Sequence, residues 1–433
     1  MNSSPQQAKE SHGWKPDEWH LLLCSAAWFA TLLAGYYMIR PVREAMGVEG
    51  GIKELKSLFA IVFGTMLVAV PCYAQLVSRL RRRLLVPIVY RFLISNLLLF
   101  SIGLYAFDGT ARTWVARTLF VWVSVYSLFA MSLFWSVMAD TFRPEQGKRL
   151  FGSIAGAGTM GGLLGSAFAG SSLISDIGVS GLLLFPAVMM EFGLFLYRRL
   201  EKLRMGADLK LQRPTGGNPF SGFTSVLRSP YLLSICGYVF LTAVCGTTLY
   251  LQQAEVVGAA VPNEEDRVQL FARLDFYVQA LTLFFQFVVA GWLMKFSLPV
   301  TLCVLPLAYL IGFSSIGMNP TFYVTLTTVV FTRAAVYGLT VPAQGVLYTV
   351  VSKEEKYKAK NVIDTVVTRG GDAMVSQIGG RLNAMKVPPL SLAWWMIPIA
   401  TAWLAMAYLL GLRSVKKAAQ QSASMAEATD SAP

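Results

Sequence analysis

Charged side chains interrupt the long apolar runs of this sequence, and they are its best candidates for chemistry. Arg369 and Asp372 stand three residues apart, so they would share one face of a helix. A charge held inside an apolar medium costs at least a few kcal/mol and should therefore find a partner or a ligand. Ten such positions lie in or at the edges of the runs: Arg91, Arg117, Arg273, Arg333, Arg369, Arg381, Asp140, Asp275, Asp364 and Asp372.

Cations outnumber anions among these positions, which favours an anionic or zwitterionic ligand. Guanidinium groups also match the planar geometry of phosphate and carboxylate. Arg273 with Asp275, and Arg369 with Asp372, are best interpreted as facing an internal cavity. A structural ion pair, or a side chain reaching the lipid headgroups, explains the arginines near expected helix ends equally well: Arg91, Arg117 and Arg381.

The elements that must position these charges are membrane-spanning helices. The chain has 433 residues, of which 55% are hydrophobic and 14% are charged, whereas a soluble domain has roughly 45–50% apolar and 25% charged residues. A spanning helix needs about 20 apolar residues. We therefore expect an all-α integral membrane protein with about twelve transmembrane helices. The apolar runs centre near 20–39, 57–77, 84–107, 114–138, 150–173, 177–197, 230–252, 267–294, 297–316, 321–349, 362–385 and 390–412.

The longest polar segment lies midway and divides the expected spans six and six. This division predicts two six-helix bundles around a central path, the plan of the major facilitator superfamily. The expected order is a cytoplasmic segment, a first bundle, a cytoplasmic linker with an interfacial helix, a second bundle and a disordered cytoplasmic tail. The corresponding boundaries are 1–18, 19–198, 199–229, 230–413 and 414–433.

Lysine and arginine are concentrated in alternate connections between the runs. The positive-inside rule then places both termini in the cytoplasm of a bacterial inner membrane. The first apolar run is long enough to span and follows a mixed-charge segment, so we expect an uncleaved first helix and not a signal peptide.

Several classes of function are disfavoured by the composition. Only two histidines occur, His12 and His20, and the five cysteines have no ligand spacing, so neither a metal site nor a cofactor or catalytic centre is expected. The net charge of +13 resides at the ends of apolar segments, which argues against nucleic acid. We expect a monomeric protein that is not an enzyme, with membrane lipid and a small anionic solute as its partners.

Glycines gather in the expected fifth and eleventh spans. Small residues let membrane helices approach closely, and tight packing is the favoured interpretation of the fifth span, 150–173. Gly370 and Gly371 lie between Arg369 and Asp372. They could permit a bend beside a binding site, although packing alone explains them about as well.

Several segments together resemble the ATP/ADP translocases, or NTP/NDP exchangers, of plastids and intracellular bacteria. Tyr36-Tyr37-Met38-Ile39-Arg40-Pro41-Val42-Arg43-Glu44 is similar to the family's first-span Tyr-x3-Arg-x2-Lys-Asp segment, and Leu55-Lys56 to the Leu-Lys that follows it. The remaining similar segments are Phe134-Trp135 with Lys148-Arg149-Leu150-Phe151, Asp275-Phe276-Tyr277, and the series Lys356, Lys358, Lys360, Asp364 and Arg369.

Two positions depart from that family. Tyr250 stands where the exchangers have an acidic residue, and Asp372 stands where they have a lysine. The resemblance therefore implies the scaffold more securely than nucleotide selectivity.

From the charges and the resemblance we predict a secondary transporter that moves an anionic metabolite, with a nucleotide as one candidate, by exchange and alternating access. The alternative is a proton-coupled exporter or a lipid flippase, in which Asp275 or Asp372 carries the proton. The predicted substrate-binding residues are Tyr36, Arg40, Arg43, Lys56, Arg273, Asp275 and Arg369. The predicted charge-pairing residues are Glu44, Asp364 and Asp372.

Overall fold

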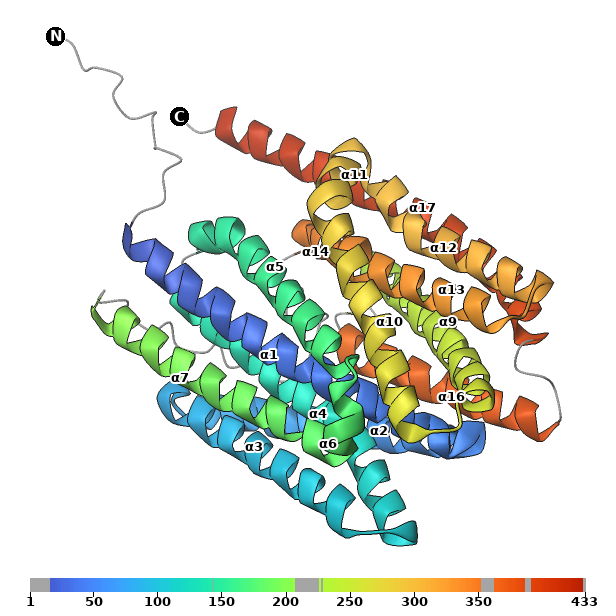
Figure 1. Ribbon diagram of the computed structural model, residues 1–433. Helices are drawn as coiled ribbons and strands as arrows, with labels where there is room; N and C mark the ends of the chain where they lie inside the picture. Colours follow the sequence, from blue (N-terminus) through green and yellow to red (C-terminus); the bar gives the residue numbers. More distant parts are fainter. Residues whose placement is uncertain are drawn as a thin grey trace.

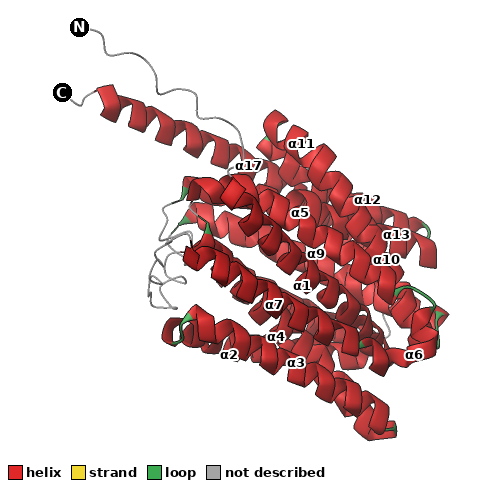
Figure 2. Ribbon diagram, turned by 60° about the vertical axis from the view of Figure 1, so that its left-hand side comes forward, coloured by secondary structure: helices red, strands yellow, loops and turns green. Residues whose placement is uncertain are grey.

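A computed structural model describes residues 16–142, 144–206, 226, 229–351, 362–385 and 391–430. Every element of secondary structure in these ranges is a helix (Figure 2). We call residues 16–206 the first half and residues 226–430 the second half. Figure 1 shows the blue-to-green helices of the first half on one side and the yellow-to-red helices of the second half on the other.

The first half consists of seven helices, and all of them are α-helical. They are α1 (Pro16–Glu49), α2 (Gly51–Arg79), α3 (Arg82–Ala106), α4 (Gly109–Thr141), α5 (Pro144–Ala169), α6 (Leu173–Leu182) and α7 (Leu184–Gly206).

Three segments of π-helix, η1, η2 and η4, interrupt the helices of the second half. Its elements are α9 (Pro230–Ala260), α10 (Glu264–Phe284), η1 (Phe285–Val289), α11 (Ala290–Phe296), α12 (Leu298–Met318), α13 (Phe322–Ala335), η2 (Val336–Thr340), α14 (Val341–Leu347), η3 (Tyr348–Val350), η4 (Ile363–Val367), α16 (Thr368–Ala384) and α17 (Leu392–Asp430).

Two hydrophobic cores lie within this arrangement. The first is built mainly from the first half, with additional residues from α9, α10 and α13, and the second lies wholly in the second half. The halves meet where α10 packs on α1 and α5, and where α16 packs on α2.

Nine helices in the described part of the chain are long and apolar enough to cross a membrane, and a tenth results if α5 and α6 form one bent span. The chain bends by 114° between these two helices. The expected number was about twelve. The difference arises at α7, where Arg198, Arg199 and Glu201 follow the apolar turns, and at α16, which has 17 residues and contains three charges.

Backbone contact between α1 and α5 explains the glycines of the fifth apolar run. A Cβ atom at Gly161 would overlap the carbonyl oxygen of Ala30, and one at Gly165 would overlap that of Ala34. The two helices can approach this closely only because these positions lack side chains. The packing interpretation therefore agrees with the structure.

The prediction of a disordered tail after residue 413 was wrong for the described residues, because α17 continues to Asp430. This segment is rich in alanine, glutamine and lysine, which favour helix. The Gln421 amide also donates to the carbonyl oxygen of Val350 (3.2 Å). Helix α7 likewise extends past the expected boundary at 198, to Gly206. The expected interfacial helix near 218–228 lies almost entirely outside the described residues.

Candidate functional site

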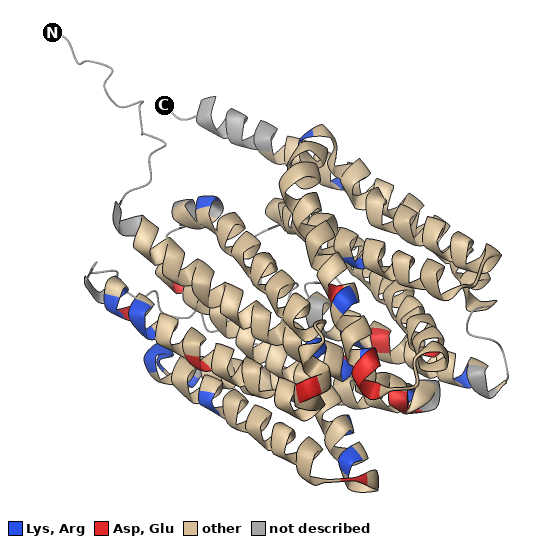
Figure 3. Cartoon of the chain, viewed as in Figure 1, with Lys and Arg blue, Asp and Glu red and all other residues tan. Residues whose placement is uncertain are grey.

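A cavity of about 540 Å³ lies between the two halves. Its walls come from α1 and α2 of the first half and from α9, α12, α13, η2, α14, η3 and α16 of the second half. Figure 3 shows charged residues near the helix ends and in a group between the halves. Among the described residues, the charged side chains that line the cavity are Arg40, Arg43, Glu44, Arg333, Arg369 and Asp372.

Helix α1 supplies two of the four cavity arginines together with their shared carboxylate. Glu44 Oε1 lies 3.8 Å from Arg40 Nε and 3.4 Å from Arg43 Nη1. The Arg43 guanidinium also stacks over the Phe120 ring at 4.3 Å, which holds it beside the cavity. The predicted grouping of Arg40, Arg43 and Glu44 on one helix is thus present in the structure.

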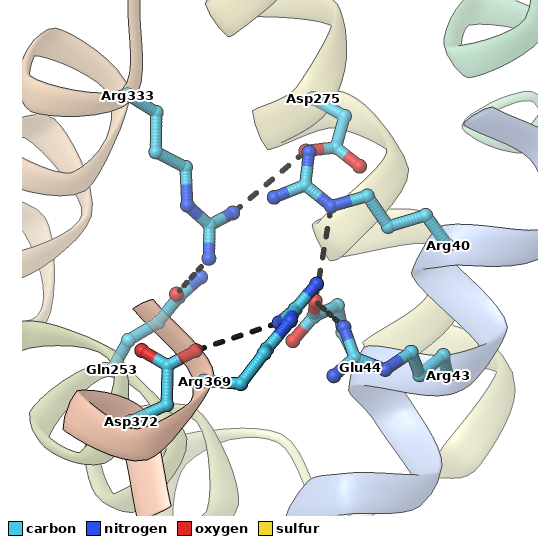
Figure 4. A network of polar contacts seen from close by, with 8 residues as sticks. All are labelled: Arg40, Arg43, Glu44, Gln253, Asp275, Arg333, Arg369 and Asp372. Atoms are coloured by element: carbon cyan, nitrogen blue, oxygen red, sulfur yellow. Dashed lines mark hydrogen bonds and ion pairs between the residues drawn. The ribbon is translucent and has the colours of Figure 1, made fainter. Parts of the chain in front are cut away.

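Asp275 lies behind the cavity wall on α10, with only 1% of its surface exposed. Its Oδ1 atom is 3.0 Å from Arg40 Nη1 and 3.8 Å from Arg333 Nη1. Figure 4 shows the carboxylate between these two guanidinium groups, one from each half. A buried carboxylate needs such partners, because an unpaired charge there would be strongly destabilising.

Helix α16 contributes the pair that was predicted to share a helix face. Arg369 Nη1 lies 3.4 Å from Asp372 Oδ2, and the Thr247 hydroxyl donates to Asp372 Oδ1 at 2.7 Å. The helix continues through Gly370 and Gly371 without a break. The local irregularity lies instead at η4, immediately before Arg369.

Arg333 and Gln253 line the cavity but were not among the predicted binding residues. Arg333 Nη2 donates to Gln253 Oε1 at 3.0 Å, and Gln253 is 1% exposed. Arg333 could have been found, since it is a charge within an apolar run. Gln253 is uncharged, so its position gave no comparable signal.

A neutral polar wall continues from Arg333 along α13, η2, α14 and η3. Side chains four residues apart face the cavity in succession: Thr332, Val336, Thr340, Gln344 and Tyr348. Tyr309 and Tyr337 add further hydroxyl groups. This part of the cavity offers hydrogen bonds and apolar surface without formal charge.

Tyr36, the tyrosine predicted at the site, belongs to α1 of the first half. Tyr36 lines the cavity and stacks on Tyr126, with ring centroids 6.4 Å apart. Tyr250, which replaces an acidic residue of the resembled family, lies against the Glu44 carboxylate. Glu44 therefore places a carboxylate close to Tyr250, the position where the resembled family has an acidic residue.

Besides Asp275, two further predicted binding residues do not line the cavity. Lys56 packs its methylenes against Gly380 of α16, and its carbonyl oxygen accepts from the Gln377 amide (2.9 Å). Arg273 reaches the carbonyl oxygen of Gly170 (3.4 Å) at the α5–α6 break. Neither lines the cavity. Helix periodicity does not reveal which of two nearby cations a neighbouring helix covers. The side chain of Asp364 lies outside the described residues.

The remaining charges of the apolar runs form pairs away from the cavity. Arg91 pairs with Glu191 (2.9 Å), Arg117 with Glu54, and Asp140 with Arg82 (3.0 Å). Arg381 is exposed in the last turn of α16. These placements fit the structural interpretation. In the described part of the chain, no group of three histidine, cysteine or acidic residues is arranged to hold a metal ion.

The arrangement of the helices is similar to that of several solved transporter structures. No model of a known protein family matches the chain, and neither does any curated protein sequence. Many solved structures share its fold. A POT family transporter in complex with 5-aminolevulinic acid superimposes with a TM-score of 0.62 and 13% identity, over 91% of this chain and 96% of that chain.

Two further structures are similar over nearly their whole length. One is a bacterial homologue of the iron transporter ferroportin in an inward-facing state, with TM-score 0.59, 14% identity and coverage of 92% and 98% of the two chains. The other is the nucleoside transporter NupG, with TM-score 0.54, 12% identity and coverage of 93% and 100%. These structural neighbours are transporters and not enzymes. At such low identity the similarity defines the fold and not the substrate.

Proposed function

We propose that this protein is a secondary transporter that exchanges small anionic metabolites across a bacterial inner membrane. One observation carries the proposal: four arginines from both halves converge on a single cavity, with three carboxylates beside them. Among the described residues this leaves one positive charge in excess. An anion bound there would neutralise it and satisfy guanidinium donors that face the cavity.

The neutral wall from Thr332 to Tyr348 supports an organic anion over a simple inorganic one. Its hydroxyl, amide and aromatic groups would contact the uncharged body of the solute, while Arg43, Arg333 and Arg369 hold its charged end. The cavity volume of about 540 Å³ lies within the range of roughly 300–1,000 Å³ that is typical of small-molecule sites. A nucleotide is one such anion.

Alternating access would proceed by rocking the two halves against each other around the cavity. Three polar contacts between the halves lie at the face formed by the turns near residues 50, 107, 171 and 262. They join Arg112 to Glu264 (2.6 Å), Gln269 to Ser175 (3.0 Å) and Gln377 to the Lys56 carbonyl (2.9 Å). The cavity extends towards the opposite face along Gln344 and Tyr348. With both termini cytoplasmic, this arrangement is an inward-facing state.

Counterflow in proteoliposomes tests the proposal. Vesicles loaded with an unlabelled organic anion should take up its labelled form, and Arg369→Gln should reduce that uptake by about tenfold or more, since a charge-assisted hydrogen bond is lost. Arg91→Gln is the matched control, because Arg91 and Glu191 are 59% and 50% exposed and lie away from the cavity. Undiminished uptake by Arg369→Gln would overturn the proposed site.

A proton-coupled exporter or lipid flippase is the second candidate, and the burial of Asp275 is the observation that favours it. Transport by that mechanism should stop when a protonophore collapses the pH gradient, and it should not need an anion inside the vesicles. Exchange that continues without the gradient would exclude proton coupling.

A further inference from the structure

Asp275 differs from the other two carboxylates of the site in its position. Glu44 and Asp372 line the cavity, whereas Asp275 lies behind Arg40 and Arg333, which do line it. One oxygen, Oδ1, is close to both guanidinium groups, at 3.0 Å and 3.8 Å. Neither Asp275 oxygen has a hydrogen-bond partner of good geometry among the described residues. Asp275 is thus close enough to the arginines for an ion pair, but the contact lacks the geometry of a hydrogen bond.

A solute anion in the cavity would approach the same two arginines from the opposite side. Figure 4 shows Arg40 and Arg333 converging on Asp275 from different helices, with Glu44 and Arg369 nearby. Each guanidinium would then have two anions competing for its donors. The Arg333 contact is the longer of the two, so it is the first that a bound solute would weaken.

We infer that Asp275 is a resident counter-anion that competes with the solute for Arg40 and Arg333 and ties the two halves together when the site is empty. The tie exists because Arg40 belongs to α1 of the first half and Asp275 to α10 of the second half. This inference rests on the proposed transport function and specifies how the site is regulated. An empty protein held in this way reorients slowly, which makes transport an exchange and prevents net leakage.

Asp140 provides the matched control for this role. Its partner, Arg82, belongs to the same half, and the Arg82 Nε to Asp140 Oδ2 distance is 3.0 Å. Neither residue lines the cavity. Loss of the Asp140 charge therefore removes a carboxylate–guanidinium pair without cutting a tie between the halves.

The first test measures efflux of a labelled organic anion from proteoliposomes, with and without the same anion outside. In the wild type, efflux should require the external anion. In Asp275→Asn, efflux into empty buffer should rise about tenfold or more relative to exchange, while Asp140→Asn keeps the wild-type ratio. An unchanged ratio in Asp275→Asn, or an equal change in both variants, would overturn the inference.

The second test does not require a transported solute. Spin labels at Asp108 and Asn319, in turns of the first and second half, report the distance between the halves in purified protein. Asp275→Asn should broaden the ligand-free distance distribution, and Asp140→Asn should leave it unchanged. Arg40→Gln cuts the same tie and should also broaden it, which covers the case in which Asp275→Asn does not fold. An unaltered distribution in the variants that cut the tie would refute the tie itself. Broadening without any anion transport would instead support the tie and refute the proposed function.

Discussion

The two halves of this molecule are built from different kinds of helix. Among the described residues the first half contains no π-helix, although it is bent between α5 and α6 and irregular at Gly178, and α1 and α5 meet backbone to backbone at glycines. The second half contains three π-helical segments within the described residues. Two of them adjoin cavity arginines, since η2 begins three residues after Arg333 and η4 ends two residues before Arg369.

This difference indicates that the two halves have different mechanical roles. Close packing resists deformation, so the first half presents Arg40 and Arg43 from a rigid platform. A π-helical turn disturbs the regular hydrogen-bond ladder and is frequent at functional sites. The second half can therefore adjust Arg333 and Arg369 around a solute. Substitutions that act on packing in the first half should reduce stability, whereas those near the π-helices should reduce transport.

The largest effect is expected at the α1–α5 contact. Gly161→Val would place a side chain into the backbone of α1 at Ala30, and no rotamer relieves this overlap. We expect loss of folded protein in detergent, measured by size-exclusion chromatography and thermal unfolding. Gly152→Val on the same helix has nothing within 4 Å of the new Cβ and serves as the control. A normal yield of folded Gly161→Val would contradict the rigid-platform interpretation.

Removal of a cavity charge from either half should have the next largest effect. Arg43→Gln and Arg333→Gln should each reduce the initial rate of anion uptake by about 10- to 100-fold, since each loses a charge-assisted hydrogen bond. Thermal stability should change far less than in Gly161→Val. If only the second-half variant lost transport, the site would not be shared between the halves.

A moderate effect is expected at η2. Gly338 packs on the junction of α10 and η1, where a new Cβ would lie 2.5 Å from Phe285 Cβ and 3.3 Å from the Thr282 carbonyl oxygen. Gly338→Ala should fold, slow exchange about threefold to tenfold and leave anion binding nearly unchanged, because small overpacking costs roughly 1–3 kcal/mol. Gly291→Ala, with open space around its Cβ, is the control. Equal exchange rates in both variants would remove the argument for a deformable second half.

The smallest effect is expected at the contact between Arg112 and Glu264, which joins the halves at the closed face. Their side chains are 27% and 21% exposed, so the pair should contribute about 1 kcal/mol or less. Arg112→Gln should lower the melting temperature slightly in low salt and not at all in 1 M salt, where the charges are screened. A large decrease that persists in high salt would show that this pair is a main determinant of closure.

Most spanning segments could be predicted from the sequence, because an apolar run of about 20 residues has few other uses. The fifth run was expected to end near residue 173, close to the end of α5 at Ala169, but the bend of 114° between α5 and α6 could not be predicted from that run. Helices α7 and α16 were counted as spans because both combine apolar turns with charged residues. The helical tail was missed because helix-forming and disorder-associated residues overlap in composition.

The candidate site was predicted in part. Helix spacing brings Arg40, Arg43 and Glu44 together on α1, and Arg369 and Asp372 together on α16. Spacing does not show that both groups line one cavity, which depends on how the helices pack. Lys56 and Arg273 do not join them, since the contact of one helix with another decides which cations face the cavity. Arg333 joins the site through α13, a relation between distant segments that spacing along the chain cannot reveal.

The claim that this cavity binds an organic anion through its arginines is tested most directly by ligand-dependent thermal stability of the purified protein. Inorganic phosphate, a sugar phosphate, a nucleotide, a dicarboxylate and a neutral nucleoside would be compared. We predict that at least one organic anion raises the melting temperature in a concentration-dependent way, that the neutral nucleoside does not, and that the double variant Arg43→Gln/Arg333→Gln shows no increase. An equal increase in the wild type and the double variant would contradict the account.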